Sequence, residues 1–240
     1  MALQLGNITA IHGDCMDYMI TLPDNAYDLA IIDPPYGINA DNMSMGTNLT
    51  RKGDGYPGES VAQRLRKGRL NSGGGKLKGR ILNKSNISWD VAPSKKYFDE
   101  LFRVSKDQII WGGNYFDLPP TRCIICWDKI QPWDNFSQFE LAWTSFDTPA
   151  AIFRYSNTGG ANKEKKIHPT QKPVSLYHWL LNKYATEGYK ILDTHGGSFS
   201  HAIACHDLDF ELTIIEKDME YFNKAIERLK WHQRQMQLSL

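Results

Sequence analysis

The sequence predicts an α/β protein whose largely parallel sheet carries antiparallel strands at one edge. Three observations favour this fold class. Apolar runs of strand length alternate with helical patterns both before residue 115 and after residue 170, two of these runs end in an aspartate and a turn, and three further strand-like runs lie between the two halves. The 240 residues, 41% of them hydrophobic, are enough for one well-filled domain.

In the N-terminal half, an alternating run that enters Gly13-Asp14 predicts the first strand, and Pro23 ends the short helix after it. The next apolar run is typical of a buried strand. After a long basic segment, three large apolar residues on one helical face predict a helix, and a second apolar run predicts a strand that ends at two glycines. The predicted strands are 8–12, 27–32 and 108–111, and the predicted helices are 16–22 and 94–104.

In the C-terminal half, three closely spaced runs predict the antiparallel edge. Pro173 is favoured at a helix start, and strands then alternate with helices to the end of the sequence. The predicted strands are 123–127, 139–143, 150–153, 189–192 and 212–215, and the predicted helices are 173–185, a stretch before 212, and 218–233.

The tetrapeptide Asp33-Pro34-Pro35-Tyr36 follows the strand 27–32, so it would lie at the carboxyl edge of the sheet, where ligands bind in such folds. The carboxylate of Asp33 and the carbonyl of Pro34 can each accept one hydrogen of an aromatic amine and so draw its lone pair out of the ring. The prolines stiffen the turn and add no competing N–H donor, and Tyr36 offers a flat face for a base. A plain capped turn is the alternative interpretation.

A second strand end predicts a cofactor site. Asp193 is followed by Gly196 and Gly197, which let the backbone approach a ligand closely. Glu216 ends the next strand, 23 positions later, where an acidic residue in such folds holds ribose hydroxyls. Upstream, Lys172 precedes a helix N-terminus, which can hold a carboxylate. An ordinary strand-to-helix turn and an ordinary helix cap are the alternatives.

Charge is unevenly distributed, although the net charge is only +1. Residues 51–84 contain ten Lys or Arg against two acidic residues, which gives this segment +8 and leaves −7 on the rest of the chain. The segment also holds eight glycines, so we expect it to be mobile without a partner and to contact a polyanion. A solvated loop is the alternative. The candidate contacts are Arg51, Lys52, Arg64, Arg66, Lys67, Arg69, Lys76, Lys78 and Arg80.

Three motifs stand in one order: Asp33-Pro34-Pro35-Tyr36, then His168-Pro169-Thr170-Gln171-Lys172-Pro173, then Leu192-Asp193-Thr194-His195-Gly196-Gly197-Ser198. In this order they resemble the permuted (β-class) DNA amino-methyltransferase family, in which the catalytic half precedes the cofactor half. Softer matches extend the resemblance over nearly the whole chain; they are Gly13-Asp14-Cys15, Trp111-Gly112-Gly113-Asn114, Phe139-Glu140-Leu141-Ala142-Trp143 and Glu216-Lys217-Asp218-Met219-Glu220-Tyr221.

The resemblance implies a Rossmann-like, doubly wound sheet that binds S-adenosylmethionine, in a single methyltransferase domain over residues 1–240. Residues 1–36 and 88–155 would form the catalytic half, 37–87 a mobile basic loop that contacts DNA, and 164–240 the cofactor-binding half.

The resemblance also implies a role for each motif residue. Asp33 and Pro34 would orient the target amine, with Pro35 in the same catalytic turn, and Tyr36 would stack on the base. Asp14 would contact the adenine of the cofactor, Glu216 its ribose and Lys172 its carboxylate. The remaining cofactor-binding residues would be Asp193, His195, Gly196, Gly197 and Ser198.

The chain departs from the family pattern in two places. The family's cofactor turn usually reads Asp-Pro-Phe-x-Gly-Ser-Gly, whereas Thr194 and His195 replace Pro-Phe here and Phe199 stands at the last Gly. The Phe199 ring would either crowd the cofactor or point into the core. In addition, only residues 145–166 are available for a target-recognition region, so we expect the basic loop to make much of the DNA contact.

The function implied is methyl transfer to the exocyclic amine of a flipped-out DNA base. Adenine N6 is expected before cytosine N4, because Asp at the head of the tetrapeptide favours adenine in this family. Methylation of RNA or of a protein amide is a second enzymatic interpretation, and a nucleic-acid-binding relative without catalysis is a third. The expected partner is double-stranded DNA; a homodimer and a partnered restriction endonuclease are left open.

Composition gives the expected location. No stretch approaches the roughly 18 apolar residues of a membrane span, and Met1-Ala2-Leu3-Gln4 lacks the features of a signal peptide. Four cysteines fit a reducing compartment, so we expect the cytoplasm. No metal site is expected, because Cys123 and Cys126 would face opposite sides of a strand.

Replacing the Lys and Arg residues of 51–84 by alanine should weaken DNA binding across all sequences and flatten its salt dependence, because fewer counterions are released when fewer phosphates are contacted. Binding measured over a range of salt concentrations checks this expectation. An unchanged salt slope would contradict it.

Overall fold

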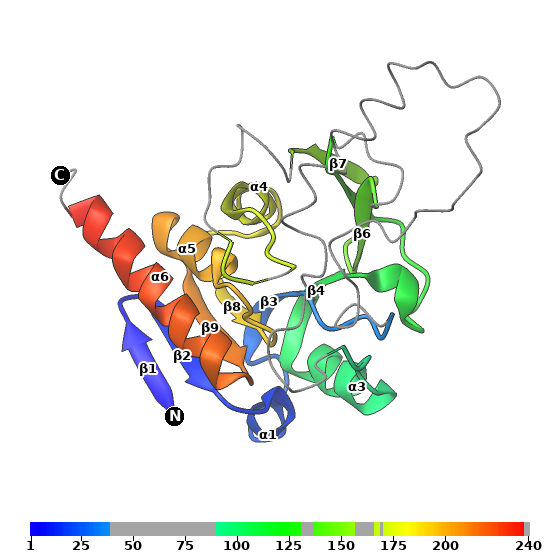
Figure 1. The fold of residues 1–240 in the computed structure, drawn as a ribbon. Coiled ribbons are helices and arrows are strands. Elements are labelled where there is room, and N and C mark those ends of the chain that lie inside the picture. Colours follow the sequence, from blue (N-terminus) through cyan, green and yellow to red (C-terminus); the bar gives the residue numbers. More distant parts are fainter. Residues whose placement is uncertain (39–89, 131–136, 157–165, 169, 238–240) are drawn as a thin grey trace, which may run out of the picture. The chain divides into compact units, whose positions relative to one another are not determined.

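The structure, a computed structural model, describes residues 1–38, 90–130, 137–156, 166–168 and 170–237 (Figure 1). The chain forms two compact units, one of residues 1–36 with 92–240 and one of residues 37–91. Every helix and strand of the described residues belongs to the first unit. The basic segment 51–84, with all nine candidate DNA contacts, lies outside the described residues.

A nine-stranded sheet forms the centre of the first unit, with the strand order β1-β2-β9-β8-β3-β4-β6-β5-β7. The strands are β1 (Ala2–Leu5), β2 (Ile8–His12), β3 (Tyr27–Ile32), β4 (Ser105–Trp111), β5 (Ile124–Asp128), β6 (Phe139–Thr144), β7 (Ala151–Arg154), β8 (Lys190–Asp193) and β9 (Glu211–Glu216). The five adjacent strands β2, β9, β8, β3 and β4 are parallel to one another. Strand β6 pairs antiparallel with both β4 and β5. The predicted fold class is therefore confirmed.

The two edges of the sheet differ from the prediction. At one edge, β1 was not predicted; it pairs antiparallel with β2 through a turn at Gly6-Asn7, a two-residue connection typical of a hairpin. At the other edge, β7 pairs with β5 and runs parallel to it, although an antiparallel strand was expected. Because the chain reverses after β6 and then pairs with β5 instead of β6, β7 takes the direction of β5.

Helices cover both faces of the sheet. They are α1 (Cys15–Met19), α3 (Lys95–Val104), α4 (Val174–Tyr184), α5 (Ser200–Asp207) and α6 (Met219–Gln237), and a 3-10 turn spans Gly113–Tyr115. Helices α4, α5 and α6 pack on one face, and α1 and α3 on the other (Figure 1). Along β3, Leu29 and Ile31 face the first group, and Ala30 and Ile32 face the second. Among the described residues, no helix combines the length and apolarity needed to cross a membrane.

The neighbours β3 and β8 mark the point where the chain winds in opposite directions. From β3 it passes through α3 to β4, and from β8 it passes through α5 to β9 on the other side. Ala30 is level with Leu192, so Asp33 and Asp193 come at the same edge of the sheet. In doubly wound sheets, ligands bind in the crevice at this switch point.

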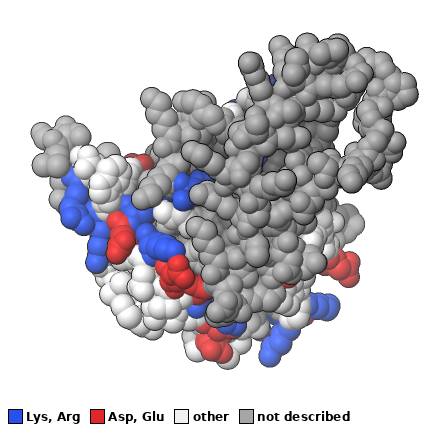
Figure 2. Space-filling view, viewed as in Figure 1, with Lys and Arg blue, Asp and Glu red and all other residues white. Residues whose placement is uncertain are grey.

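Positive and negative side chains are mixed on the face that carries α6 (Figure 2). Oppositely charged side chains form two ion pairs here, Lys224 with Glu220 and Lys217 with Asp14. The described residues of this face therefore show interspersed charge, in contrast to the concentration of Lys and Arg in residues 51–84 of the sequence.

Asp207 of α5 forms hydrogen bonds to the two other helices on its face of the sheet, α4 and α6. Its Oδ2 accepts a hydrogen bond from His178 Nε2 of α4 at 3.0 Å, and its Oδ1 accepts one from His232 Nε2 of α6 at 2.6 Å. Burial alone would raise the pKa of Asp207, but the two imidazole donors outweigh it, and the pKa lies below its usual value.

Asp207→Asn should lower the free energy of unfolding at pH 7 by about 1–3 kcal/mol, because hydrogen bonds to a charged group are lost. The folded pKa is depressed, so the stabilisation is present above the unfolded pKa of about 3.9 and is lost as the pH falls through the folded value. Denaturant unfolding of both proteins should therefore show a smaller difference at pH 3 than at pH 7.

The matched control is Asp147→Asn, which removes an exposed ion pair with Arg122. It should change stability by less than about 0.5 kcal/mol. Equal losses in the two variants would show that Asp207 does not act as the link between the helices.

Candidate active site

Asp33 follows β3 directly and is held at both carboxylate oxygens. The Tyr36 hydroxyl donates to Oδ1 at 2.8 Å, and Lys172 Nζ lies 2.5 Å from Oδ2. The side chain is 18% exposed. Each carboxylate oxygen has two acceptor positions, so Asp33 can still accept a hydrogen bond from an incoming donor at either oxygen.

Lys172 is the centre of a row of four charges, which we call the charge row: Asp33, Lys172, Glu140 and Lys129. Lys172 Nζ lies 3.0 Å from Glu140 Oε2, and Lys129 Nζ lies 2.5 Å from Glu140 Oε1. Lys172 is only 3% exposed. The four residues come from the loop after β3, the segment before α4, β6 and the loop after β5, and their formal charges cancel.

Two aromatic rings lie close to the ammonium group of Lys172. Its Nζ lies 5.2 Å from the centre of the Trp111 ring and 5.9 Å from that of Tyr36. Trp111 is fully buried at the end of β4. Cation–π attraction adds to the ion pairs here.

The pKa values in the charge row follow from burial and from the neighbouring charges. Burial raises the pKa of Asp33, and the charge of Glu140 adds to this; the opposing effect of Lys172 does not cancel them. For Glu140, the ammonium groups of Lys172 and Lys129 outweigh burial and lower the pKa to about 2. For Lys172, the two carboxylates outweigh burial and raise the pKa, so that it stays a cation.

Tyr36 is fixed by its neighbours. Its ring stacks on the half-exposed Tyr115, with centroids 5.0 Å apart and planes at 19°. Gly112 has a φ of +71°, and a Cβ added there would overlap the Tyr36 ring. Burial and the Asp33 charge raise the pKa of Tyr36 well above its usual value, so the hydroxyl stays protonated and donates to Asp33.

Three carboxylates lie at the same edge of the sheet as Asp33, at the carboxyl ends of β2, β9 and β8. Asp14 accepts from Met16 N at 2.9 Å and pairs with Lys217. Glu216 accepts from the backbone N–H of Gly197 and Asp218, each at 2.7 Å, and burial raises its pKa to about 6.

The third carboxylate, Asp193, is buried at the end of β8. Its Oδ1 accepts from His195 N and its Oδ2 pairs with His201 Nδ1, both at 3.0 Å. His195 contacts Thr194 through Nδ1, and burial lowers its pKa to about 4. Both imidazoles thus help to fix the turn.

Phe199 points into the core and not toward the three carboxylates. Its ring is fully buried and meets Phe222 edge-on, with centroids 6.0 Å apart. A Cβ added at Gly196 would lie 2.5 Å from the Phe199 ring, so the glycine rests directly on that ring. Of the two orientations that the sequence allowed for Phe199, the structure has the core one. Ser198, which precedes Phe199 in the sequence, is buried, and its hydroxyl lies 3.1 Å from that of Ser200.

The predicted residues fall into two groups at one edge of the sheet. Asp33, Pro34, Pro35 and Tyr36 form one group, and Asp14, Asp193, His195, Gly196, Gly197, Ser198 and Glu216 form the other. Lys172 was expected at a cofactor carboxylate, but its observed partners are Asp33 and Glu140. Contact between Lys172 and a cofactor stays a prediction.

Sequence reasoning gave no role to several residues of the site. They are Glu140, Lys129, Trp111, Gly112 and Tyr115. Glu140 had a signal, since it is an acidic residue within an otherwise apolar strand. Its partners come from distant parts of the chain, so the spacing in the sequence does not reveal them.

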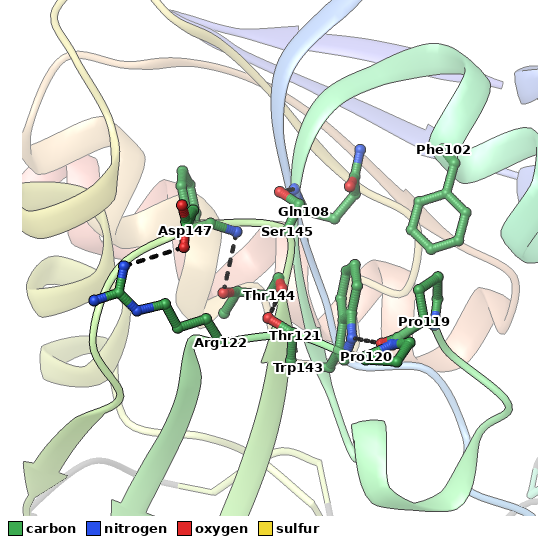
Figure 3. A pocket seen from close by; sticks show the side chains of 11 residues that line it. Phe102, Gln108, Pro119, Pro120, Thr121, Arg122, Trp143, Thr144, Ser145 and Asp147 are labelled. Atoms are coloured by element: carbon green, nitrogen blue, oxygen red, sulfur yellow. Dashed lines mark hydrogen bonds and ion pairs between the residues drawn. The ribbon is translucent and has the colours of Figure 1, made fainter.

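An open hollow of about 410 Å³ lies elsewhere, beside Phe102, Trp143 and the prolines at 119 and 120 (Figure 3). Trp143 Nε1 donates to the Pro119 carbonyl at its rim. None of the predicted site residues lines this hollow, so it does not belong to the site.

Comparison with known proteins matches the chain to a family model and, among other relatives, to two type II methyltransferases. Residues 129–227 match a family model, N6_N4_Mtase, described as DNA methylase. The chain is 23% identical to the type II methyltransferase M2.MboI of Moraxella bovis over 254 aligned positions, which cover 92% of this chain and 87% of that protein. It is 35% identical to the type II methyltransferase M.HpaI of Haemophilus parainfluenzae over 81 residues, which are 34% of this chain and 26% of that protein.

Among solved structures, the M1.HpyAVI–SAM complex has a TM-score of 0.54 at 17% identity, covering 92% of this chain and 98% of that one. At this identity the match shows a common fold. The family match and the two relatives agree with the resemblance inferred from the motifs and confirm it.

Gly112→Ala should displace the Tyr36 ring, because the added methyl group overlaps it. We expect a loss of about 2–4 kcal/mol in the free energy of unfolding, from overpacking and from the left-handed backbone together. The measurement is denaturant unfolding, with near-ultraviolet circular dichroism as a report on tyrosine packing.

Gly188→Ala is a matched control, since Gly188 also has a positive φ, +83°, but has open space around its Cβ position. It should show the backbone cost alone, about 1–2 kcal/mol. If both variants lose the same stability, close packing of Gly112 against Tyr36 is excluded as a constraint.

Proposed function

We propose that this chain, a relative of the N6/N4 DNA methylases, transfers a methyl group from S-adenosylmethionine to the N6 amine of adenine, in a base flipped out of duplex DNA. The observation that carries the proposal is Asp33, a carboxylate fixed at both oxygens by Tyr36 and Lys172 at the switch point of the sheet. At the same edge of the sheet lie three carboxylates, at the ends of β2, β8 and β9, and the turn after β8 with its two adjacent glycines.

The second group of residues fits S-adenosylmethionine by its chemistry. Asp14, Asp193 and Glu216 present carboxylates at the ends of three neighbouring strands, which suits a ligand with hydroxyl, amine and ammonium donors and a positive charge. Gly196 and Gly197 carry no side chain of their own, although the Phe199 ring lies against Gly196. When bound, S-adenosylmethionine would supply an electrophilic methyl group.

Asp33 would act as a hydrogen-bond acceptor for the target amine. Its oxygens keep free acceptor positions, and the Pro34 carbonyl offers a second acceptor next to it. The amine nitrogen gains one methyl group and must release one proton, which Asp33 can accept or pass to water. Tyr36 and Lys172 hold the carboxylate in one orientation, so the acceptor is in place before the substrate arrives.

The choice of adenine over cytosine rests on the aspartate at the head of the tetrapeptide. Cytosine N4 is the alternative, because the matching family includes both kinds of enzyme by its name. Contact with DNA through residues 51–84 and a cytoplasmic location stay predictions.

Transfer of labelled methyl to mixed-sequence duplex DNA, followed by nucleoside analysis, tests the function. The native protein should produce N6-methyladenine, and Asp33→Ala should reduce turnover at least about 100-fold, because the positioned acceptor is lost. Cofactor binding, measured separately by calorimetry, should persist in the variant. Asp147→Ala, at an exposed aspartate away from both groups, serves as the control and should keep its activity.

The other outcomes point to the alternatives. N4-methylcytosine would identify the cytosine enzyme. Cofactor binding without transfer to DNA would contradict the substrate and direct attention to RNA or to a protein amide. If the protein neither binds the cofactor nor transfers methyl groups, a nucleic-acid-binding relative without catalysis is favoured.

A further inference from the structure

Glu140, whose side chain is 23% exposed, is a second carboxylate on the ammonium group that holds Asp33. Lys172 Nζ lies 2.5 Å from Asp33 Oδ2 and 3.0 Å from Glu140 Oε2. Asp33 alone would be enough to balance one buried cation. A second carboxylate, with its own cation Lys129 at 2.5 Å, costs further desolvation. Charge balance at Lys172 therefore does not explain why Glu140 is at this position.

Among the residues that the structure describes, Lys172 and Glu140 are the charges that act on Asp33. Of the titratable groups that face it, Tyr36 comes from its own loop and Tyr177 from α4; burial raises the pKa of both phenols well above the usual value, so they are neutral. Lys172 precedes α4 and is a cation, and Glu140 on β6 is an anion.

The two charges act in opposite directions. An ammonium group at 2.5 Å stabilises the ionised Asp33 and competes with any other donor for its oxygens. Glu140 shares the same ammonium group and repels the Asp33 charge. Because Lys129 holds the far oxygen of Glu140, this negative charge is fixed.

We propose that Glu140 is a positioning residue that acts on Asp33 through Lys172. It divides the attraction of the ammonium group between two carboxylates, so that Asp33 is held in its orientation but keeps acceptor strength for the amine hydrogen. The proposal deepens the proposed function and rests on it for the identity of the donor that Asp33 receives.

The charge row gives each variant a definite sign. Burial and Glu140 raise the pKa of Asp33, while Lys172 and Tyr36 lower it. Glu140→Gln removes a raising charge, so the pKa of Asp33 should fall. Lys172→Met removes the lowering charge, so that pKa should rise.

The test is the pH dependence of methyl transfer, whose acid limb reports ionisation of Asp33. In Glu140→Gln the acid limb should move to lower pH, and in Lys172→Met to higher pH, each by about one unit. Lys172→Arg, which keeps the charge, should move the limb less than Lys172→Met. Glu211→Gln, at an exposed carboxylate at the opposite end of β9, is the matched control and should leave the profile unchanged.

Loss of packing cannot produce shifts of opposite sign, so the direction separates an electrostatic role from a structural one. Shifts in the same direction, or none in Glu140→Gln, would overturn the proposal. If Lys172→Met does not fold, the direction of the shift in Glu140→Gln still decides.

A second measurement does not depend on activity. In protein labelled with carbon-13 at the aspartate carboxyls, the Asp33 signal is assigned by its loss in Asp33→Asn and is titrated in each variant. Opposite shifts in a protein that transfers no methyl group would retain the electrostatic role and reject the proposed function. If the protein is active but Asp33 titrates at the same pH in all variants, the proposed function is retained and the electrostatic role of Glu140 is rejected.

Discussion

The ion pairs of Lys172 determine how the site is built. A buried ammonium group is tolerated only where carboxylates balance it, and Lys172 has two, Asp33 and Glu140. These come from β3 and β6, which do not pair with each other because β4 lies between them. The ring of Trp111, at the end of β4, lies 5.2 Å from the Lys172 ammonium group. The interaction thus fixes three strand ends and the segment before α4 relative to one another.

The antiparallel edge explains how Glu140 reaches this site. In a purely parallel sheet, a residue near the start of a strand lies at the edge opposite to the ligands. Because β6 runs against β4, with Ala142 level with Trp111, its first residues lie at the carboxyl edge of the parallel strands. The edge therefore adds a charged residue to a crevice that the parallel strands alone would line with their carboxyl ends.

The fold and most strand ends were predictable because they depend on local patterns. The buried strand before Asp33 and the one before Asp193 follow from apolar runs, and their common edge follows from parallel pairing. The pairing of Lys172 with Glu140 was not predictable, because it joins residues 32 positions apart through the tertiary fold. The parallel direction of β7 was missed for a similar reason, since strand order is not local.

Phe199 and Gly196 illustrate a dependence between two positions. Phe199 has a left-handed backbone, φ +58°, which costs about 1–2 kcal/mol for a residue with a side chain. Its buried ring lies under Gly196, and loss of a buried phenyl ring costs about 3–5 kcal/mol. Glycine at 199 would thus be unfavourable overall, and a larger residue at 196 is blocked while the ring is present. The effect of a substitution at 196 therefore depends on the residue at 199, so the two positions are coupled energetically.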